Sequence, residues 1–156
     1  MEKVPITRDG FNQLQARLLY LRRVVRPQIL QELEEARALG IKIENQEYIS
    51  ARERYLIVQK QIQELTAKIA SCEIFAGRKF YSKQVGFGAI ATIRNLETGE
   101  VHVYQLVGPF EADVTKGKLS IDSPVGKSLI GRREGDNVTV YTPGGVRVYH
   151  ILSIQI

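Results

Sequence analysis

Hydrophobic side chains in the first half of the chain recur at alternating spacings of three and four residues. One unbroken stripe consists of Tyr48, Ala51, Tyr55, Val58, Ile62, Leu65, Ile69 and Cys72. An earlier stripe runs through Phe11, Leu14, Leu18, Leu21 and Val25 and resumes with Leu30 and Leu33. This spacing is typical of the a and d positions of a coiled coil. The pattern therefore predicts two long helices that pack along one seam.

Helix-capping and helix-breaking residues indicate where these helices begin and end, and a short connection indicates their direction. Thr7 or Asp9 can cap the start of the first helix, and Gly40 is a natural stop. Pro27 lacks a backbone N–H inside this helix, so we expect a kink or a register slip there. Because the connection to the second helix is short, the two helices are expected to be antiparallel neighbours. Arms of about 28 residues would form a rod about 40 Å long.

From Phe80 onward the hydrophobic period changes to two, which predicts strands. A short helix is expected where Ser123 and Pro124 provide a cap and a first-turn proline, with Gly131 after its end. The expected strands cover residues 89–94, 101–107, 118–121, 138–141 and 146–154, and the short helix covers 125–130. The fold class is therefore α+β. We expect an antiparallel coiled-coil hairpin over residues 1–76 with its tip at about 39–47, a linker over 77–85, and a small antiparallel-sheet domain over 86–156.

Net charge, cysteine content and the length of apolar runs exclude only a few classes of protein. The net charge of +5 favours a protein that works near nucleic acid, although a solubilising surface charge is the alternative. Cys72 is the single cysteine, which excludes an internal disulfide and a cysteine zinc cluster. No apolar run approaches the roughly 20 residues of a membrane span, and the first residues contain no apolar signal core. We therefore expect a cytoplasmic protein with no membrane partner.

Residues 36–53 carry the most informative motif of the chain. They match the pattern A-R-x-x-G-D-L-S-E-N-A-E-Y-x-x-A-K-E at Ala36, Arg37, Gly40, Glu44, Asn45, Glu47, Tyr48, Ala51 and Glu53, with Arg52 in place of the lysine. Further matches are the Arg26-Pro27 pair, the S-I-x-S-P segment over 120–124, and residues 128–131, 134–136 and 142–145. Over nearly its whole length the chain resembles the Gre family of bacterial transcript cleavage and transcription elongation factors.

The resemblance implies a partner, a cofactor and roles for particular residues. The sheet domain would resemble the FKBP fold and dock on the rim of the secondary channel of RNA polymerase. The hairpin would enter the channel, and Glu44, with Glu47 as a weaker candidate, would help hold a Mg²⁺ ion in the polymerase active site during two-metal RNA hydrolysis. The chain would thus have no cofactor of its own, would be a monomer and not an enzyme by itself, and would regulate transcription on DNA.

Two further residue groups have roles under the same resemblance, each with a simpler alternative. Asp122, Ser123 and Pro124 are the candidates for docking on polymerase, and they could equally form a plain helix cap. Arg37, Arg52 and Lys42 are candidates for phosphate contact near the 3′ end of the nascent RNA. For Arg37 and Arg52, the alternative is ion pairing on the helix surface.

The tip departs from the family pattern at one carboxylate. The position of the expected Asp is Ile41, and Lys42 and Ile43 replace the Leu and Ser that follow it. A lost ligand that supplied roughly 3 kcal/mol to the transition state would slow cleavage about 100-fold. We therefore expect weak stimulation of cleavage, or a paralogue that does not cleave and regulates polymerase by occupying the channel. Ile41 and Ile43 could fold back on the hairpin end or contact an apolar surface of polymerase.

Two other function classes stay open at this point. A peptidyl-prolyl isomerase or chaperone would follow from an FKBP-like domain, but it needs an aromatic-lined pocket and the chain has no Trp. A coiled-coil adaptor without any enzymatic effect would tolerate replacement of the tip.

Overall fold

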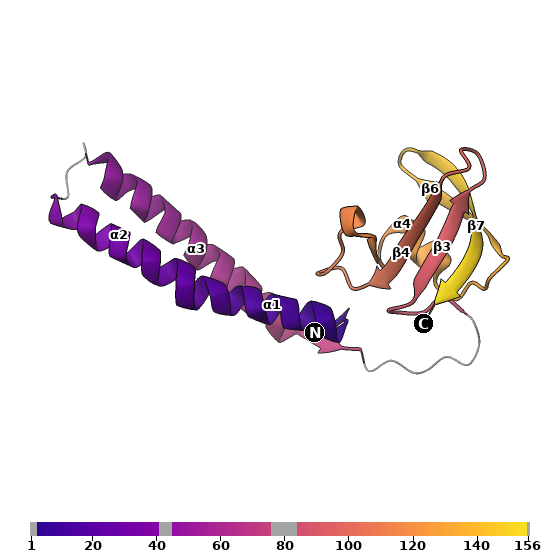
Figure 1. The fold of residues 1–156 in the computed structure, drawn as a ribbon, viewed down its shortest axis with the longest axis horizontal. Helices are drawn as coiled ribbons and strands as arrows, with labels where there is room; N and C mark the ends of the chain where they lie inside the picture. Colours follow the sequence, from indigo (N-terminus) through magenta and orange to yellow (C-terminus); the bar gives the residue numbers. More distant parts are fainter. Residues whose placement is uncertain (1–2, 41–44, 76–83, 156) are drawn as a thin grey trace. The chain divides into compact units, whose positions relative to one another are not determined.

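The computed structural model describes residues 3–40, 45–75 and 84–155. It confirms the α+β class, with a helical N-terminal region and a curled, mainly antiparallel sheet (Figure 1). The chain divides into two compact units. Residues 9–71 form the helical unit, and residues 1–8 together with 72–156 form the sheet unit.

The helical unit is a hairpin, as the heptad spacing predicts. Its elements are α1 (Arg8–Tyr20), a π-helical segment (Leu21–Val25), α2 (Arg26–Ala38) and α3 (Gln46–Ser71). Figure 1 shows α1 and α2 following α3 in the opposite direction. Leu21, Ile29, Val58 and Ile62 form the buried seam, with Leu18, Val25, Tyr55 and Leu65 packed against it.

The expected register slip at Pro27 is confirmed as a π-helical turn just before it. The N–H of Arg26 donates to the carbonyl of Leu21, five residues back. The extra residue of such a turn rotates the residues that follow by about 100°. As a result, Ile29 is buried at 8% exposure while Leu30 is 39% exposed. The prediction that the stripe resumes at Leu30 was therefore wrong.

A two-stranded parallel sheet, which no sequence pattern predicted, is formed by the segments that come directly before and after the hairpin in the sequence. Its strands are β1 (Val4–Ile6) and β2 (Cys72–Ile74), with Val4 opposite Cys72. The heptad spacing predicts that Cys72 continues the helical seam. This prediction was wrong, because α3 ends at Ser71 and Cys72 begins β2. Ile6 is completely buried, which explains why so short a pairing is stable.

The sheet domain contains five strands in the order β5-β4-β3-β7-β6. Its elements are β3 (Ile90–Asn95), β4 (Val101–Val107), a 3₁₀ turn η2 (Val114–Lys116), β5 (Lys118–Ser120), α4 (Pro124–Leu129), β6 (Asn137–Thr142) and β7 (Gly145–Gln155). All neighbouring strands are antiparallel except β4 and β5, which are parallel. A register shift between Thr92 and Ile93 helps the sheet to curl around its core. The largest fully buried side chains of that core are Ile93, Leu106, Leu129, Ile151, Val85, Val138 and Val140.

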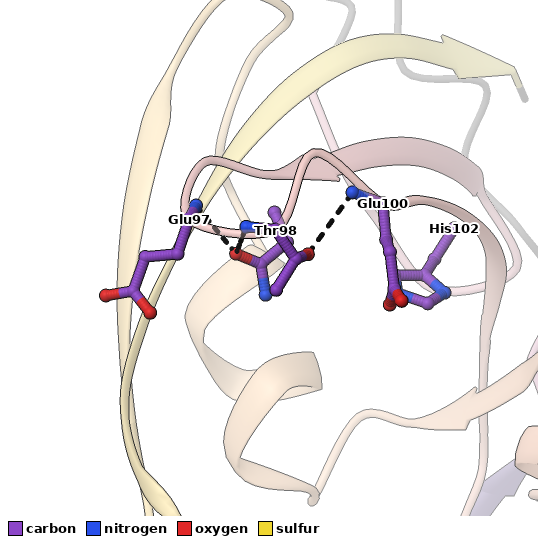
Figure 2. Close-up of polar contacts among 5 residues, drawn as sticks. Glu97, Thr98, Glu100 and His102 are labelled. Atoms are coloured by element: carbon purple, nitrogen blue, oxygen red, sulfur yellow. Dashed lines mark hydrogen bonds and ion pairs between the residues drawn. The ribbon is translucent and has the colours of Figure 1, made fainter.

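The turn between β3 and β4 is held by local polar contacts. The side-chain oxygen of Asn95 accepts hydrogen bonds from the N–H groups of Glu97 and Thr98, at 2.9 and 3.2 Å. Figure 2 shows these contacts and places His102 beside Glu100, with 3.5 Å between Nε2 and Oε2. His102 therefore lies in β4 directly after the turn, and its contact with Glu100 is local. Within the described part of the chain, no helix is long and apolar enough to cross a membrane.

Candidate functional site at the hairpin tip and the α4 loop

The centre of the predicted tip site lies outside the described residues. This applies to Ile41, Lys42, Ile43 and Glu44, so the expectations for their side chains stay predictions. The described residues on both sides of this segment define how the hairpin closes.

Asn45 caps α3 and at the same time contacts the end of α2. Its Oδ1 accepts a hydrogen bond from the N–H of Tyr48 at 3.0 Å, which satisfies one unpaired donor of the α3 N-terminus. Its Nδ2 donates to the carbonyls of Ala36 and Gly40, at 2.9 and 2.7 Å. Gly40 has a φ of 104°, the left-handed conformation that favours glycine after a helix, so its prediction as the stop of the first helix is confirmed.

Glu47 lies on one flank of the hairpin. It lines a groove of about 640 Å³ between α2 and α3, together with Glu32, Glu35, Ala36, Leu39, Gln46, Ser50, Ala51 and Arg54. A salt bridge joins Arg54 Nη1 to Glu32 Oε2 at 2.7 Å across the two helices. The side chain of Glu47 is exposed, so its carboxylate is accessible from solvent.

Arg37 and Arg52 lie on the opposite flank. Each follows a buried alanine, Ala36 in α2 and Ala51 in α3, and each is exposed. Successive helical residues are rotated by about 100°, and the residues that precede both alanines line the groove. The residue after each alanine therefore points to the side opposite the groove. Because the two right-handed helices run in opposite directions, this side is the same flank of the hairpin for both. Arg37 and Arg52 therefore share one flank of the hairpin, and Glu47 lies on the other.

The surface-pairing alternative for these two arginines has no support within the described residues. Among them, neither Arg37 nor Arg52 forms a salt bridge. Groups of three or more His, Cys, Asp or Glu side chains that could hold a metal ion are also absent from the part of the chain that the structure describes.

The second candidate site is the loop before α4. Ser123 caps this helix, since its Oγ accepts from the N–H of Gly126 at 3.1 Å and donates to the carbonyl of Ser120 at 2.6 Å. The predicted cap is therefore confirmed. Asp122 and Pro124, on either side of it, are exposed. The cap fixes the backbone that carries these two side chains.

An apolar pocket adjoins this loop, and the sequence analysis missed it. It has a volume of about 530 Å³ and is lined by Phe75, Gln84, Val85, Gly86, Phe87, Ile121, Lys127, Ile130 and Gly131. The rings of Phe75 and Phe87 are in contact, with centroids 4.8 Å apart. These two residues come from either side of the predicted linker, so no local pattern could have shown that they meet.

Family models match both halves of the chain. The model described as "Transcription elongation factor, N-terminal" matches residues 4–74. The model described as "Transcription elongation factor, GreA/GreB, C-term" matches residues 81–156.

Relatives and solved structures show the extent of the similarity. The transcription elongation factor GreA of Syntrophobacter fumaroxidans is 43% identical over 155 residues, which is 99% of each chain. GreA of Methylococcus capsulatus is 42% identical over 156 residues, again 99% of each chain. Among solved structures, the GreA factor homolog 1 (Gfh1) of Thermus thermophilus is 25% identical, with a TM-score of 0.45 over 99% of this chain and 100% of the other.

Proposed function

Because the chain belongs to the GreA/GreB family of transcription elongation factors, we propose that it binds RNA polymerase and inserts its hairpin into the secondary channel. There it would act on backtracked or paused complexes, with the RNA 3′ end near the hairpin tip. The observation that carries this proposal is the tip itself. Arg37 and Arg52 share one flank, Glu47 lies on the other, and Asn45 links the start of α3 to Ala36 of α2 and to Gly40.

Docking is assigned to the loop before α4 and the pocket beside it. Stable protein interfaces combine a buried apolar centre with a polar rim. Phe75, Phe87 and Ile130 supply apolar surface. The exposed Asp122 directly follows Ile121 of the same pocket, and the exposed Pro124 begins α4. Ser123 contributes by holding this loop in place.

The tip would bring its charged groups to the polymerase active site. Arg37 and Arg52 would contact phosphates of the RNA, because guanidinium groups pair well with phosphate oxygens. Mg²⁺ takes oxygen ligands, so Glu44, and less directly Glu47, would bind it jointly with residues of polymerase. The protein would thus stimulate the cleavage activity of polymerase without being an enzyme itself, and we expect it to act in the cytoplasm as a monomer.

Stimulation of cleavage is expected to be weak. In the sequence, Ile41 directly follows Gly40, where the family pattern has an Asp. The exposed Glu47 does not replace that carboxylate in a simple way, because it lies in α3 on the groove flank and follows Glu44 by three residues in the sequence. Lys42 adds a positive charge beside the gap, which disfavours a nearby divalent cation. A factor of this kind could regulate polymerase mainly by occupying the channel.

A second candidate function is that of a peptidyl-prolyl isomerase or chaperone. Two phenylalanine rings line the apolar pocket, which meets part of the requirement for aromatic surface. A proline-isomerisation assay on the full chain distinguishes this function from polymerase binding.

Competition for polymerase tests the main proposal. The full chain is titrated against a labelled GreA protein bound to RNA polymerase. We expect displacement by the unmodified chain and weaker displacement by Asp122→Ala and Pro124→Ala, by about tenfold. Glu97→Ala, which removes an exposed carboxylate from the β3–β4 turn, is the matched control and should compete normally. No displacement by the unmodified chain would contradict the proposal.

A further inference from the structure

We propose that Asn45 is a positioning residue that fixes both ends of the tip segment, and that the action of the tip on polymerase depends on this link. The inference rests in part on the proposed function, because the consequence at polymerase requires the tip to work there. Its structural part stands on the hydrogen bonds of Asn45 alone.

The amide of Asn45 joins three backbone groups from two helix ends. Nδ2 lies 2.9 Å from the carbonyl oxygen of Ala36 and 2.7 Å from that of Gly40, while Oδ1 lies 3.0 Å from the nitrogen of Tyr48. Only this orientation of the amide satisfies all three, because the two carbonyls need a donor and the N–H of Tyr48 needs an acceptor. The hydrogen-bond pattern therefore fixes the side chain in one orientation.

The hydrogen bonds of Asn45 involve backbone groups that commonly lack partners at the end of a helical hairpin. The last carbonyls of one helix and the first N–H groups of the next have no partners within their own helices. Asn45 donates to the carbonyl of Gly40 and to that of Ala36, which also accepts from the N–H of Leu39 at 3.2 Å, and it accepts from the N–H of Tyr48. The carbonyl of Asn45 accepts from the N–H of Ile49 at 3.1 Å. Because Gly40 and Asn45 bound residues 41–44 in the sequence, the link sets the distance between the two ends of that segment.

The chemistry of this contact requires asparagine. Aspartate offers an equally good acceptor for the helix cap, but it has no donor for the carbonyls of Ala36 and Gly40 and would place a negative charge beside them. Serine can cap the helix, but it has a single donor and a shorter side chain. A residue that served only as a helix cap could be exchanged for aspartate without consequence, whereas a residue that joins the two helices could not.

The variant Asn45→Asp tests this distinction. We expect amide hydrogen exchange at Gly40 to become at least about tenfold faster in Asn45→Asp, while exchange at Tyr48 changes by less than about threefold because the cap remains. Asn45→Ala, which removes donor and acceptor together, should accelerate exchange at both positions. Arg54→Ala is the matched control, since it cuts the Arg54–Glu32 salt bridge between the same helices without touching the link.

The same variants are then compared on RNA polymerase at saturating concentration. The measured effect is the rate of transcript cleavage or, where the unmodified chain does not stimulate cleavage, the slowing of nucleotide addition. We expect Asn45→Asp to half-saturate polymerase within about threefold of the unmodified chain, while its saturating effect falls at least about tenfold. Arg54→Ala should leave both quantities nearly unchanged.

Each outcome decides the inference. Faster exchange at Gly40 together with a reduced saturating effect supports it. Unchanged exchange at Gly40 in Asn45→Asp overturns the link, and faster exchange with an unchanged saturating effect overturns the positioning role. If the unmodified chain has no effect on polymerase at all, the proposed function fails, and the exchange measurement alone decides whether Asn45 joins the two ends.

Discussion

Thr7 and Glu111 are joined by two hydrogen bonds although 104 residues separate them in the sequence. The backbone N–H of Thr7 donates to Oε1 at 2.8 Å, and its hydroxyl donates to Oε2 at 2.5 Å. Oε1 also accepts from the N–H of Gly108 at 3.0 Å. A side chain on Gly108 would place its Cβ 1.9 Å from the carbonyl oxygen of Pro5. One carboxylate and one close backbone contact thus fasten the end of β1 to the loop after β4.

The first prediction concerns this carboxylate. Glu111→Gln keeps the size of the side chain but removes the negative charge that strengthens its hydrogen bonds to Thr7 and Gly108, and it replaces one acceptor oxygen with an NH₂ group. We expect the free energy of unfolding to fall by about 1–3 kcal/mol, measured by urea denaturation. Glu97→Ala, at an exposed turn, should change it by less than about 0.5 kcal/mol. Equal effects of the two variants would contradict the structural role of Glu111.

The second prediction concerns the thiol of Cys72. Burial raises the pKa of Cys72, and the negative charge of Glu111 raises it further. The folded state therefore holds the thiol proton more tightly than the unfolded chain does. Its contribution to stability is complete below the ordinary pKa of 9.0 and is lost as the pH rises through the higher pKa of the folded state.

Alkylation rates measure this difference directly. At about pH 8 to 9, iodoacetamide should modify Cys72 more slowly in the folded protein than in the urea-unfolded chain. Glu111→Gln should lower the apparent pKa of the folded thiol, because it removes the nearby negative charge. A folded-state pKa at or below that of the unfolded chain would be inconsistent with the partial burial of Cys72 beside Glu111.

The third prediction compares two glycines. A Cβ at Gly126, in α4, would lie 2.0 Å from the backbone oxygen of Ser120, whereas a Cβ at Gly144 would have no neighbour closer than 3.8 Å. Gly126→Ala should therefore force α4 away from the end of β5, lower the free energy of unfolding by about 1–3 kcal/mol and weaken polymerase binding. Gly144→Ala should do neither. Thermal unfolding and the competition assay provide both readouts, and normal binding by a folded Gly126→Ala variant would argue against docking through the α4 loop.

The fourth prediction concerns the basic flank of the tip. Arg37→Ala and Arg52→Ala should each weaken the functional interaction with backtracked complexes by about 1–2 kcal/mol, through loss of phosphate contact. The control is Arg54→Ala, because Arg54 lines the groove on the other flank and pairs with Glu32. The concentration giving half the maximal effect is measured at two salt concentrations. A loss that is equal for Arg54→Ala would contradict the assignment of the two flanks.

Periodicity predicted the elements of this fold well, and contacts between distant residues account for what it missed. The stripes of Leu18 and Val58 predict the hairpin because burial follows helical spacing. The slip at Pro27 was also predictable, but its size was not, so Leu30 was assigned to the seam in place of Ile29. Strands β1 and β2 pair over three residues each, which is too short for an alternation of hydrophobic and polar residues to predict a strand.

The candidate site was predictable to a similar extent. Asn45 matches the family motif but was not predicted as a helix cap, and its contacts with Ala36 and Gly40 depend on how the hairpin closes. Likewise, Ser123 was predictable as a cap, whereas the pocket beside it is assembled from segments on both sides of the linker. The role of Ile41 rests on the sequence, since it lies outside the described residues.

Cleavage of the transcript in backtracked RNA polymerase complexes, with Mg²⁺ and a labelled RNA 3′ end, tests the central claim most directly. The unmodified chain and Ile41→Asp are compared at concentrations that saturate polymerase, as established by competition. We predict that both bind and that the unmodified chain stimulates cleavage weakly, while Ile41→Asp stimulates it up to about 100-fold more. Strong cleavage by the unmodified chain, with no gain in Ile41→Asp, would contradict the claim that the missing carboxylate limits this factor.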